Sequence, residues 1–314
     1  MTRARTTHDA DALGADAPGP EASGPGPALC VLASGSGGNC AVLRTPAPGA
    51  DGGYDATLID LGLSPTRTRA ELARRGIDPS RVTDVVFTHL DSDHCHPGWI
   101  RGVHNSSWRA TLHIHERHLG RAERAGLLTT RTRPFGARHA VSESITLGSR
   151  LLAHDSLGVA CLRLEVDRGD GRRAHIGVAT DVGRVTPGLI GHLRGVDCLA
   201  IESNYDPVMQ RDSGRPEALK RRIMGGSGHL SNELSAHAVE RIAPLEHLVL
   251  LHLSRQCNSP GRVASAHARH GLAPVITDQF APTPWIRIEG RERAETSPAP
   301  AGVQGELFPA GRAG

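Results

Sequence analysis

The sequence predicts a layered α/β fold, and three features of the chain support this prediction. Short apolar runs alternate with amphipathic stretches over about residues 28 to 290, and no internal repeat interrupts them. The 314 residues can bury a sizeable core in one large domain or two ordinary ones. Because aromatic residues make up only 3% of the chain, Ala, Val, Leu and Ile must fill that core. Extensive aromatic platforms for single-stranded nucleic acid are therefore not expected.

The apolar runs have the length and composition of buried β-strands. The predicted strands are Ala28–Ala33, Cys40–Arg44, Ala56–Asp60, Val82–Thr88, Thr111–His115, Ser149–Ala153, Val159–Glu165, His175–Thr180, Cys198–Ile201 and His247–Leu251.

Two segments carry helix signals. Ser64 is a candidate N-cap, Pro65 suits the first helical position, and Gly76 is a stop signal. A second helix is expected over Ser231 to Ile242, and its predicted apolar face consists of Leu234, Ala238, Val239 and Ile242.

Both ends of the chain are rich in Ala, Gly and Pro and poor in large apolar side chains. Such segments cannot offset the entropy lost on ordering, so residues 1–27 and 291–314 are predicted to be disordered tails. The predicted folded domain covers residues 28–290.

The cysteines and the hydropathy predict a cytoplasmic protein. The six cysteines form no CxxC pair and no disulfide framework, so we expect reduced thiols. No apolar run approaches the roughly 18 to 20 residues of a membrane span, and the N-terminus lacks a signal-peptide core.

Arginine supplies almost all of the positive charge. Lys220 is the only lysine among 36 basic side chains. Arginine binds phosphate through two donors at once, so this composition is compatible with a phosphate or nucleic-acid ligand. The formal net charge of +3 is too small for a protein that coats DNA, and a local patch would have to bind it.

Four metal-capable side chains lie within six residues, directly after the predicted strand Val82–Thr88. They are His89, Asp91, Asp93 and His94. The two carboxylates have no Lys or Arg between them, and they repel each other unless a cation neutralises them. The segment therefore predicts a metal site. The alternative is a solvated acidic turn with stray histidines, in a chain that has 18 of them.

Three more strand ends carry residues of the same kind. His154, Asp181 and His252 follow the predicted strands that end at Ala153, Thr180 and Leu251. Because open α/β sheets place their sites at the carboxyl ends of their strands, we expect these side chains to converge. They complete the donor set of a dinuclear metal site.

Together these segments resemble the metallo-β-lactamase superfamily and, more closely, its YycJ (WalJ) branch. The resemblance spans about residues 28 to 270. The motifs that carry it, besides the His89 to His94 segment, are Ala33–Cys40, His154–Asp155, Ala179–Asp181, Glu202–Asp206, Gly228–Asn232 and the His252–Ser254 segment.

The resemblance implies a four-layer αββα sandwich with two divalent metal ions at one edge of the sheets. By position, the implied ligands are His89, Asp91 and His154 for the first ion, Asp93, His94 and His252 for the second, and Asp181 as the bridge. Asp60 matches a family aspartate that hydrogen-bonds the metal-binding loop without binding metal.

Position 91 departs from the branch, which usually has His there. A carboxylate is a harder ligand than imidazole and shifts the preference from zinc towards manganese or iron. We therefore expect zinc or manganese, and a site with one ion stays open.

The implied reaction is hydrolysis by a hydroxide held between two cations, with Asp93, Asp181 and His229 as catalytic residues. His229 resembles the histidine with which phosphodiesterases of the superfamily hold the scissile phosphate or protonate the leaving oxygen. The alternative for His229 is a loop residue ahead of a helix.

The branch implies a 5′ to 3′ exonuclease acting on DNA. The alternatives are a hydrolase of small phosphodiesters, lactones or thioesters, since the superfamily shares its metal ligands across these substrates, and a non-catalytic metal-binding regulatory module.

Other residues are candidates for supporting or substrate contacts. Glu202 and Asn204 follow a strand and could orient water or metal ligands, or be structural. Ser231 and Asn232 belong to the Gly228–Asn232 motif. Lys220, on a predicted helix, is a candidate phosphate contact, or a lysine retained by chance.

The C-terminal tail contains Gln304, Leu307 and Phe308 in the order Gln-Gly-Glu-Leu-Phe. This segment looks like the short peptides by which bacterial DNA-processing enzymes bind the sliding clamp. Such a match also arises by chance. Leu307 and Phe308 are nevertheless large apolar residues in a tail without a core, which suggests that a partner buries them.

Overall fold

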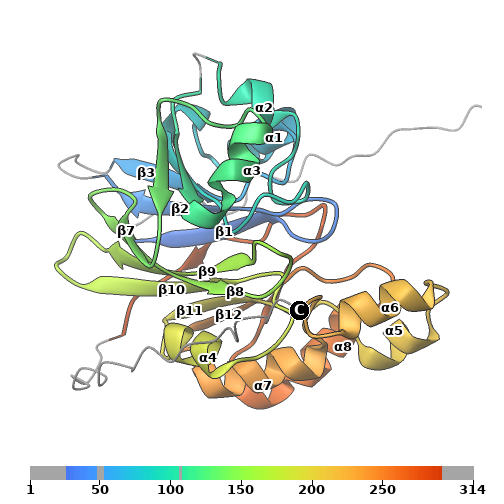
Figure 1. Cartoon of the computed structure of the whole chain (residues 1–314). Coiled ribbons are helices and arrows are strands. Elements are labelled where there is room, and N and C mark those ends of the chain that lie inside the picture. The colour runs from blue at the N-terminus through green and yellow to red at the C-terminus, as the bar shows by residue number, and fades with distance from the viewer. Residues whose placement is uncertain (1–25, 48–52, 106–107, 292–314) are drawn as a thin grey trace, which may run out of the picture.

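Two seven-stranded mixed sheets stack face to face in the computed structural model, which describes residues 26–47, 53–105 and 108–291 (Figure 1). In spatial order, the first sheet consists of β14 (Ile286–Arg287), β1 (Ala28–Ala33), β2 (Cys40–Pro46), β3 (Tyr54–Ile59), β4 (Val82–Val86), β5 (Thr111–His115) and β6 (Thr132–Phe135). The second consists of β13 (Val275–Ile276), β12 (His247–Leu251), β11 (Cys198–Glu202), β10 (Arg173–Ala179), β9 (Val159–Asp167), β8 (Ile145–Leu152) and β7 (Arg138–Ala140).

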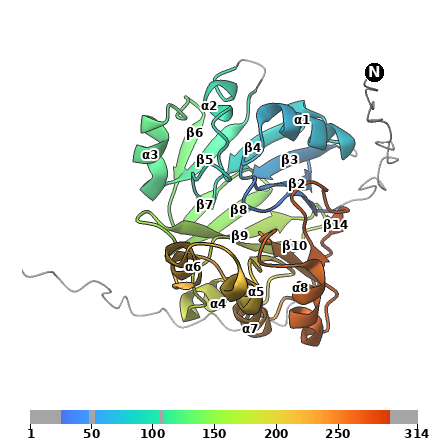
Figure 2. The ribbon, with the colours of Figure 1, turned by 90° about the vertical axis from the view of Figure 1, so that its right-hand side faces the viewer.

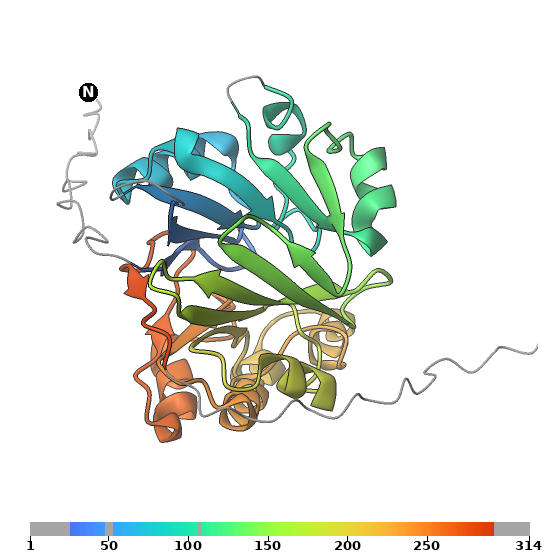
Figure 3. The ribbon, with the colours of Figure 1, turned by 90° about the vertical axis from the view of Figure 1, so that its left-hand side faces the viewer.

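Helices cover the outer face of each sheet (Figures 1, 2 and 3). The first sheet carries α1 (Pro65–Arg74), α2 (Trp99–Gly102) and α3 (Leu119–Arg124), with the 3₁₀ turns Pro79–Arg81 and Glu116–His118. The second carries α4 (Pro187–Leu193), α7 (Asn232–Ile242) and α8 (Pro260–His267), followed by the 3₁₀ turn Ala268–His270, while α5 (Pro207–Asp212) and α6 (Glu217–Met224) lie together at one end. The predicted four-layer αββα sandwich is confirmed.

Strand alternation explains the layers. In β1, Leu29 and Val31 point into the apolar core between the two sheets, while Cys30 and Leu32 point into the core under α1 to α3. A third core, which includes Leu189 of α4, lies between the second sheet and its helices. Strands buried on both faces read as continuous apolar runs, which is why they were recognisable in the sequence.

Every predicted strand has a counterpart, within a few residues at its ends. The sequence prediction missed β6, β7, β13 and β14, which are short and lie at sheet edges. Pro134 lies inside β6, and two-residue strands such as β13 carry no periodic signal.

The two predicted helices are also present, with one correction. The Ser64 side chain accepts a hydrogen bond from the backbone of Arg67, and Gly76 adopts a φ of 71° after α1. Ser231 caps α7 in the same way, but Leu234 is 42% exposed, so its place on the buried face was wrong. Ser235, one position further round the helix, is buried instead.

The cysteines and the helices bear on two further predictions, reduced thiols and the absence of a membrane span. All six cysteines are unpaired in the described part of the chain, as expected for reduced thiols. No helix among the described residues has the length and apolarity needed to cross a membrane. The predicted tails, 1–27 and 291–314, lie almost wholly outside the described residues.

The directions of the strands decide which strand ends lie together, and therefore where the residues that follow those strands are located. Strands β3 to β6 run parallel to one another, as do β10 to β13, and β8 points the same way as β10 because both pair antiparallel with β9. The carboxyl ends of β8, β10, β11 and β12 therefore lie at one edge of the second sheet.

We predict that Gly62→Ala destabilises the fold by more than about 2 kcal/mol. The backbone of Gly62 lies between two loops, donating its N–H to the Asn39 carbonyl 2.9 Å away. A Cβ there would meet the Asp93 carbonyl oxygen and the Asn39 amide nitrogen, and backbone atoms cannot rotate aside. Chemical denaturation measures the loss. The control is Gly191→Ala in α4, where a Cβ would meet nothing within 4 Å. Equal stability of the two variants would contradict this account.

Candidate metal centre

Three residues that follow the ends of strands have a strained backbone conformation. Asp60, Asp181 and His252 have φ values of 62°, 54° and 57°, in the left-handed region that non-glycine residues seldom occupy. Each lies one or two residues beyond β3, β10 or β12. Such conformations cost on the order of 1 kcal/mol and persist where the surroundings fix them, which is common at functional sites.

Histidines and carboxylates from these tips form three overlapping groups in the described residues. Within each group, the candidate ligand atoms all lie within 4.8 Å of one another. The groups are His89, His154 and Asp181; Asp93, His94 and His252; and Asp181, Glu202, His229 and His252. The first two groups correspond to the two predicted ion sites, but Asp91 is absent from the first and Asp181, the predicted bridge, belongs to the first and third groups and not to the second. Asp181 reaches the second group through His94 Nε2, 2.8 Å from its carboxylate.

Unsatisfied nitrogen atoms test whether a cation suits this donor set. His89 Nε2, His154 Nδ1 and His252 Nε2 are buried and have no hydrogen-bond partner among the described residues. A buried polar atom without a partner costs about 1–3 kcal/mol, so three of them in one place require an explanation. Divalent cations would supply one, with His89 and His154 as ligands in one group and His252 in another, and the donor set fits such ions.

Asp60 holds His94 in the orientation that a metal ligand needs. The Asp60 carboxylate accepts hydrogen bonds from the Thr88 backbone N–H (2.8 Å) and the Thr88 hydroxyl (2.7 Å) and contacts His94 Nδ1 at 2.7 Å. A proton held on Nδ1 leaves the lone pair of Nε2 facing the site, where the Asp181 carboxylate lies 2.8 Å away. Asp60 thus hydrogen-bonds this loop, and its role beside a bound metal stays a prediction.

The charges in the site are strongly coupled. Burial lowers the pKa of His89 well below its usual value, helped by the neighbouring His94, so its imidazole is neutral. Burial alone would raise the pKa of Asp181, but His252 and His94 outweigh it and hold that pKa well below the ordinary range. An ionised carboxylate is therefore buried among imidazoles.

Asp91 has a partner that the sequence analysis did not identify. One oxygen of its carboxylate lies 2.6 Å from the guanidinium of Arg121 in α3, and the other lies 3.8 Å from His89 Nε2. Arg121 also reaches the Asp155 carboxylate at 3.7 Å. Asp91 thus faces the first predicted ion site with one oxygen while an arginine binds the other.

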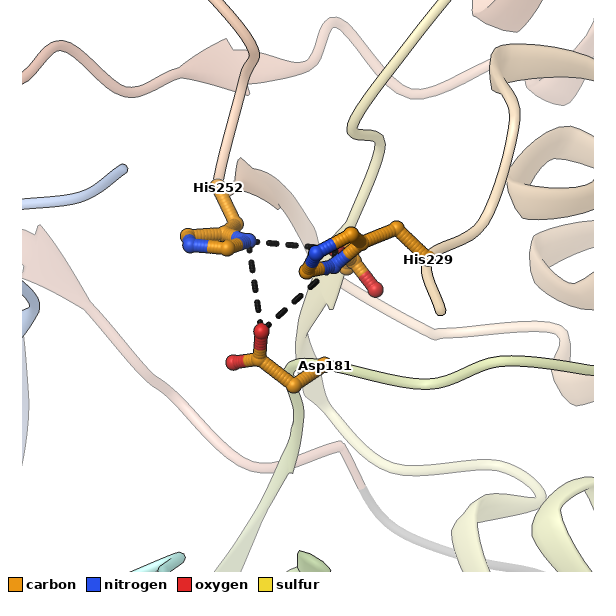
Figure 4. Close-up of side chains that lie close together, drawn as sticks. Asp181, His229 and His252 are labelled. Atoms are coloured by element: carbon orange, nitrogen blue, oxygen red, sulfur yellow. Dashed lines mark hydrogen bonds and ion pairs between the residues drawn. The ribbon is translucent and has the colours of Figure 1, made fainter. Parts of the chain in front are cut away.

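Glu202 supports the opposite side of the site. It is fully buried at the end of β11, and its Oε1 lies 2.6 Å from His229 Nδ1 and 3.1 Å from His252 Nδ1. Figure 4 shows His229 and His252 both facing the Asp181 carboxylate, at 3.4 Å and 3.6 Å. The Asn204 side chain donates to the His252 backbone carbonyl at 2.8 Å. Glu202 and Asn204 therefore position the two histidines.

The remaining predicted residues belong to none of the three donor groups. Ser231 caps α7, and Asn232 exchanges buried hydrogen bonds with Ser203 and Asn258. The Lys220 ammonium donates to the Arg211 carbonyl at 2.6 Å and pairs with Glu217 at 2.9 Å. These contacts are structural ones, and a phosphate contact by Lys220 stays a prediction.

A glycine-rich loop joins the two halves of the site, and the sequence reasoning used it only as a motif. Asn39 donates its backbone N–H to the Asp93 carbonyl (2.7 Å), and its side-chain nitrogen lies 3.0 Å from His94 Nε2. The Ser34 hydroxyl accepts the backbone N–H of His252 at 2.8 Å. Polar residues flanking a run of glycines were the available signal for a loop packed against a site.

Comparison with known proteins decides the family. The model of the metallo-β-lactamase superfamily matches residues 33–193, just over half of the chain. The chain belongs to this superfamily. The superfamily fold implies divalent metal binding, in agreement with the donor groups described above.

Relatives within the superfamily support the YycJ/WalJ-like branch. The chain is 27% identical over 241 residues to "Exodeoxyribonuclease WalJ" of Streptococcus pneumoniae, covering 73% of this chain and 82% of that protein. It is 28% identical over 247 residues to "Exodeoxyribonuclease YycJ" of Bacillus anthracis, covering 73% and 83%. Among solved structures, the metallo-β-lactamase fold protein YhfI from Bacillus subtilis has a TM-score of 0.58 at 14% identity, covering 82% of this chain and 99% of that one, which supports the superfamily fold.

We predict that Asp60→Asn lowers metal affinity about ten- to hundredfold. The amide presents an N–H to a pocket of donors, which favours moving the His94 proton from Nδ1 to Nε2 and so blocks the metal-binding lone pair. Metal content after dialysis, measured by elemental analysis, tests this. Asp212→Asn, an exposed aspartate of α5, is the control. A metal content equal to that of the wild type would refute the role assigned to Asp60.

Proposed function

We propose that this protein is a metal-dependent phosphodiester hydrolase, specifically a 5′ to 3′ exonuclease acting on DNA. The observation that supports this most is the pairing of two ion-sized donor groups with His229, which is partly exposed and held beside them. The similarity to two exodeoxyribonucleases over 73% of the chain supports the substrate class. A non-catalytic module has no need of such a complete donor set.

The proposed centre holds two divalent cations, zinc or manganese. His89, His154 and Asp91 would bind one, Asp93, His94 and His252 the other, and Asp181 both. When bound, these cations lower the pKa of a coordinated water and stabilise charge on the phosphoryl oxygens. Asp181 and Asp93 supply the negative charge that retains the cations.

The chain's own groups orient the substrate. Because Nδ1 of His229 is bound by Glu202, Nε2 is the ring nitrogen left for a phosphate oxygen or for the leaving oxygen. Glu202 is buried and also accepts the backbone N–H of Val182 at 2.9 Å, so this orientation is fixed before the substrate binds.

We predict that His89→Ala and Asp181→Ala each lower DNA cleavage by at least about a hundredfold, since each removes a ligand from the donor groups. Single and double strands labelled at the 5′ or the 3′ end, with Mn²⁺, Zn²⁺ or Mg²⁺, measure the activity and its direction. His237→Ala, an exposed histidine of α7, is the matched control.

Two outcomes would overturn this proposal. One is undiminished cleavage by either variant. The other is hydrolysis of bis-p-nitrophenyl phosphate or of a lactone panel by a wild-type protein that leaves every DNA substrate intact, which would favour a small-molecule hydrolase.

We also propose that the C-terminal segment binds a bacterial sliding clamp through Gln304, Leu307 and Phe308, which lie outside the described residues. A peptide of residues 300–314 is expected to bind the cognate clamp in a fluorescence polarisation assay. Replacing Leu307 and Phe308 by Ala removes the apolar contacts and is expected to abolish binding. Equal binding by the two peptides, or no binding by either, would contradict this proposal.

A further inference from the structure

We propose that Phe280, with Arg255 and Arg67, forms a platform on which one unpaired nucleic-acid base stacks beside the metal centre. The inference rests on the proposed nuclease function and names how the substrate is held. Phe280 is 59% exposed, whereas the other Phe, Tyr and Trp residues in the described part of the chain are buried or half-buried. A single exposed apolar side chain is common on a protein surface, so the proposal rests on what surrounds this ring.

Two arginines accompany the ring. The guanidinium carbon of Arg255 lies 4.9 Å from the centroid of the Phe280 ring, and that of Arg67 lies 5.8 Å from it. Arg67 is fixed by a hydrogen bond to the Gln279 carbonyl at 2.6 Å. Arg255 is exposed and has no hydrogen bond or ion pair with any described residue, so its donors can reach a phosphate.

The exposure does not come from a loosely held loop. The Asp278 carboxylate accepts the backbone N–H groups of Phe280 (2.7 Å) and Ala281 (3.1 Å). Ser34 donates its N–H to the Asp278 carbonyl at 3.0 Å, and Thr283 donates to the Val31 carbonyl at 2.9 Å. A ring presented by a fixed backbone loses little conformational entropy when a base stacks on it.

Gln279, the residue before Phe280, ties the platform to the loop that joins the two halves of the metal centre. The Gln279 side chain accepts the Gly37 N–H at 2.7 Å and donates to the Gly38 carbonyl at 2.9 Å, and Asn39, the next residue, contacts Asp93 and His94. On the other side, Arg255 follows His252 by three residues.

A base can stack on Phe280 only if it is not stacked and paired in a duplex. Each base stacked on a protein aromatic ring strengthens binding by about tenfold or more, whatever the base, because every base has a π face. With one such ring, the platform holds one base. We therefore expect single strands and frayed ends to bind better than blunt duplex ends.

The first test is kinetic. Phe280→Ala is expected to raise KM for a short single strand about tenfold, with a smaller effect on kcat, because the ring binds a base away from the reacting phosphate. Phe280→Trp should keep KM near that of the wild type. Metal content and the midpoint of thermal unfolding should not change, since the side chain is exposed. Leu234→Ala, which truncates another exposed apolar residue, is the control.

The second test does not depend on cleavage. In a His89→Ala background, a single strand with 2-aminopurine near its 5′ end should lose fluorescence on binding, and Phe280→Ala should remove this quenching. Arg255→Ala should weaken binding and reduce its dependence on salt concentration.

These tests separate the two proposals. A wild-type protein that cleaves no DNA contradicts the proposed function. The quenching experiment still tests whether a base stacks on Phe280, because it does not require cleavage. Unchanged KM and unchanged quenching in Phe280→Ala would overturn the platform and leave the exposed ring to a protein partner.

Discussion

The ionised carboxylate of Asp181, buried among four imidazoles, is the constraint on which the rest of this molecule depends. His94 lies 2.8 Å from it, His229 and His252 lie 3.4 Å and 3.6 Å away, and His89 belongs to the same donor group. Removing a carboxylate from water costs several kcal/mol unless nearby charges and hydrogen bonds replace the solvent. Those imidazoles come from three separate segments of the chain, since His89 and His94 share one loop, so the site exists only when both sheets have formed and stacked.

The loops at this edge are arranged to keep the imidazoles in place. Gly62 lets the backbone after β3 pass between the glycine-rich loop and the metal-binding loop, where no side chain fits. Ser34 and Asn39 then connect His252, on the second sheet, to Asp93, on the first. Fixed donors of this kind limit reorganisation when cations and substrate bind. The loops are therefore fixed by the same hydrogen bonds that keep the donor side chains in position.

Local sequence signals predicted the strands and the candidate ligands. Features that depend on contacts between residues far apart in the sequence could not be predicted. Strands such as β1 were recognisable because both faces are buried, and Asp60 and His252 were found because each directly follows a strand. The positioning role of Glu202 depends on a fold that brings β11 beside the loop of His229, 27 residues later. Phe280 gave no signal, since nothing in its local sequence distinguishes an exposed ring from a core one.

At position 91, a contact with a residue distant in the sequence changes the interpretation of the His89 to His94 segment. An aspartate where the branch usually has histidine suggested a harder, more negative ligand set. Arg121, however, binds one oxygen of that carboxylate at 2.6 Å, and the second acid near it, Asp155, already accepts the backbone N–H groups of Leu157 and Gly158. The positive charge of Arg121 offsets that of the Asp91 carboxylate, so the pair presents less negative charge to the site than a free carboxylate would. Because Arg121 already binds one oxygen, what Asp91 offers to the donor group is its second oxygen, which faces His89. The contact therefore gives the kind of donor atom, an oxygen and not a nitrogen, more weight than the charge of the carboxylate.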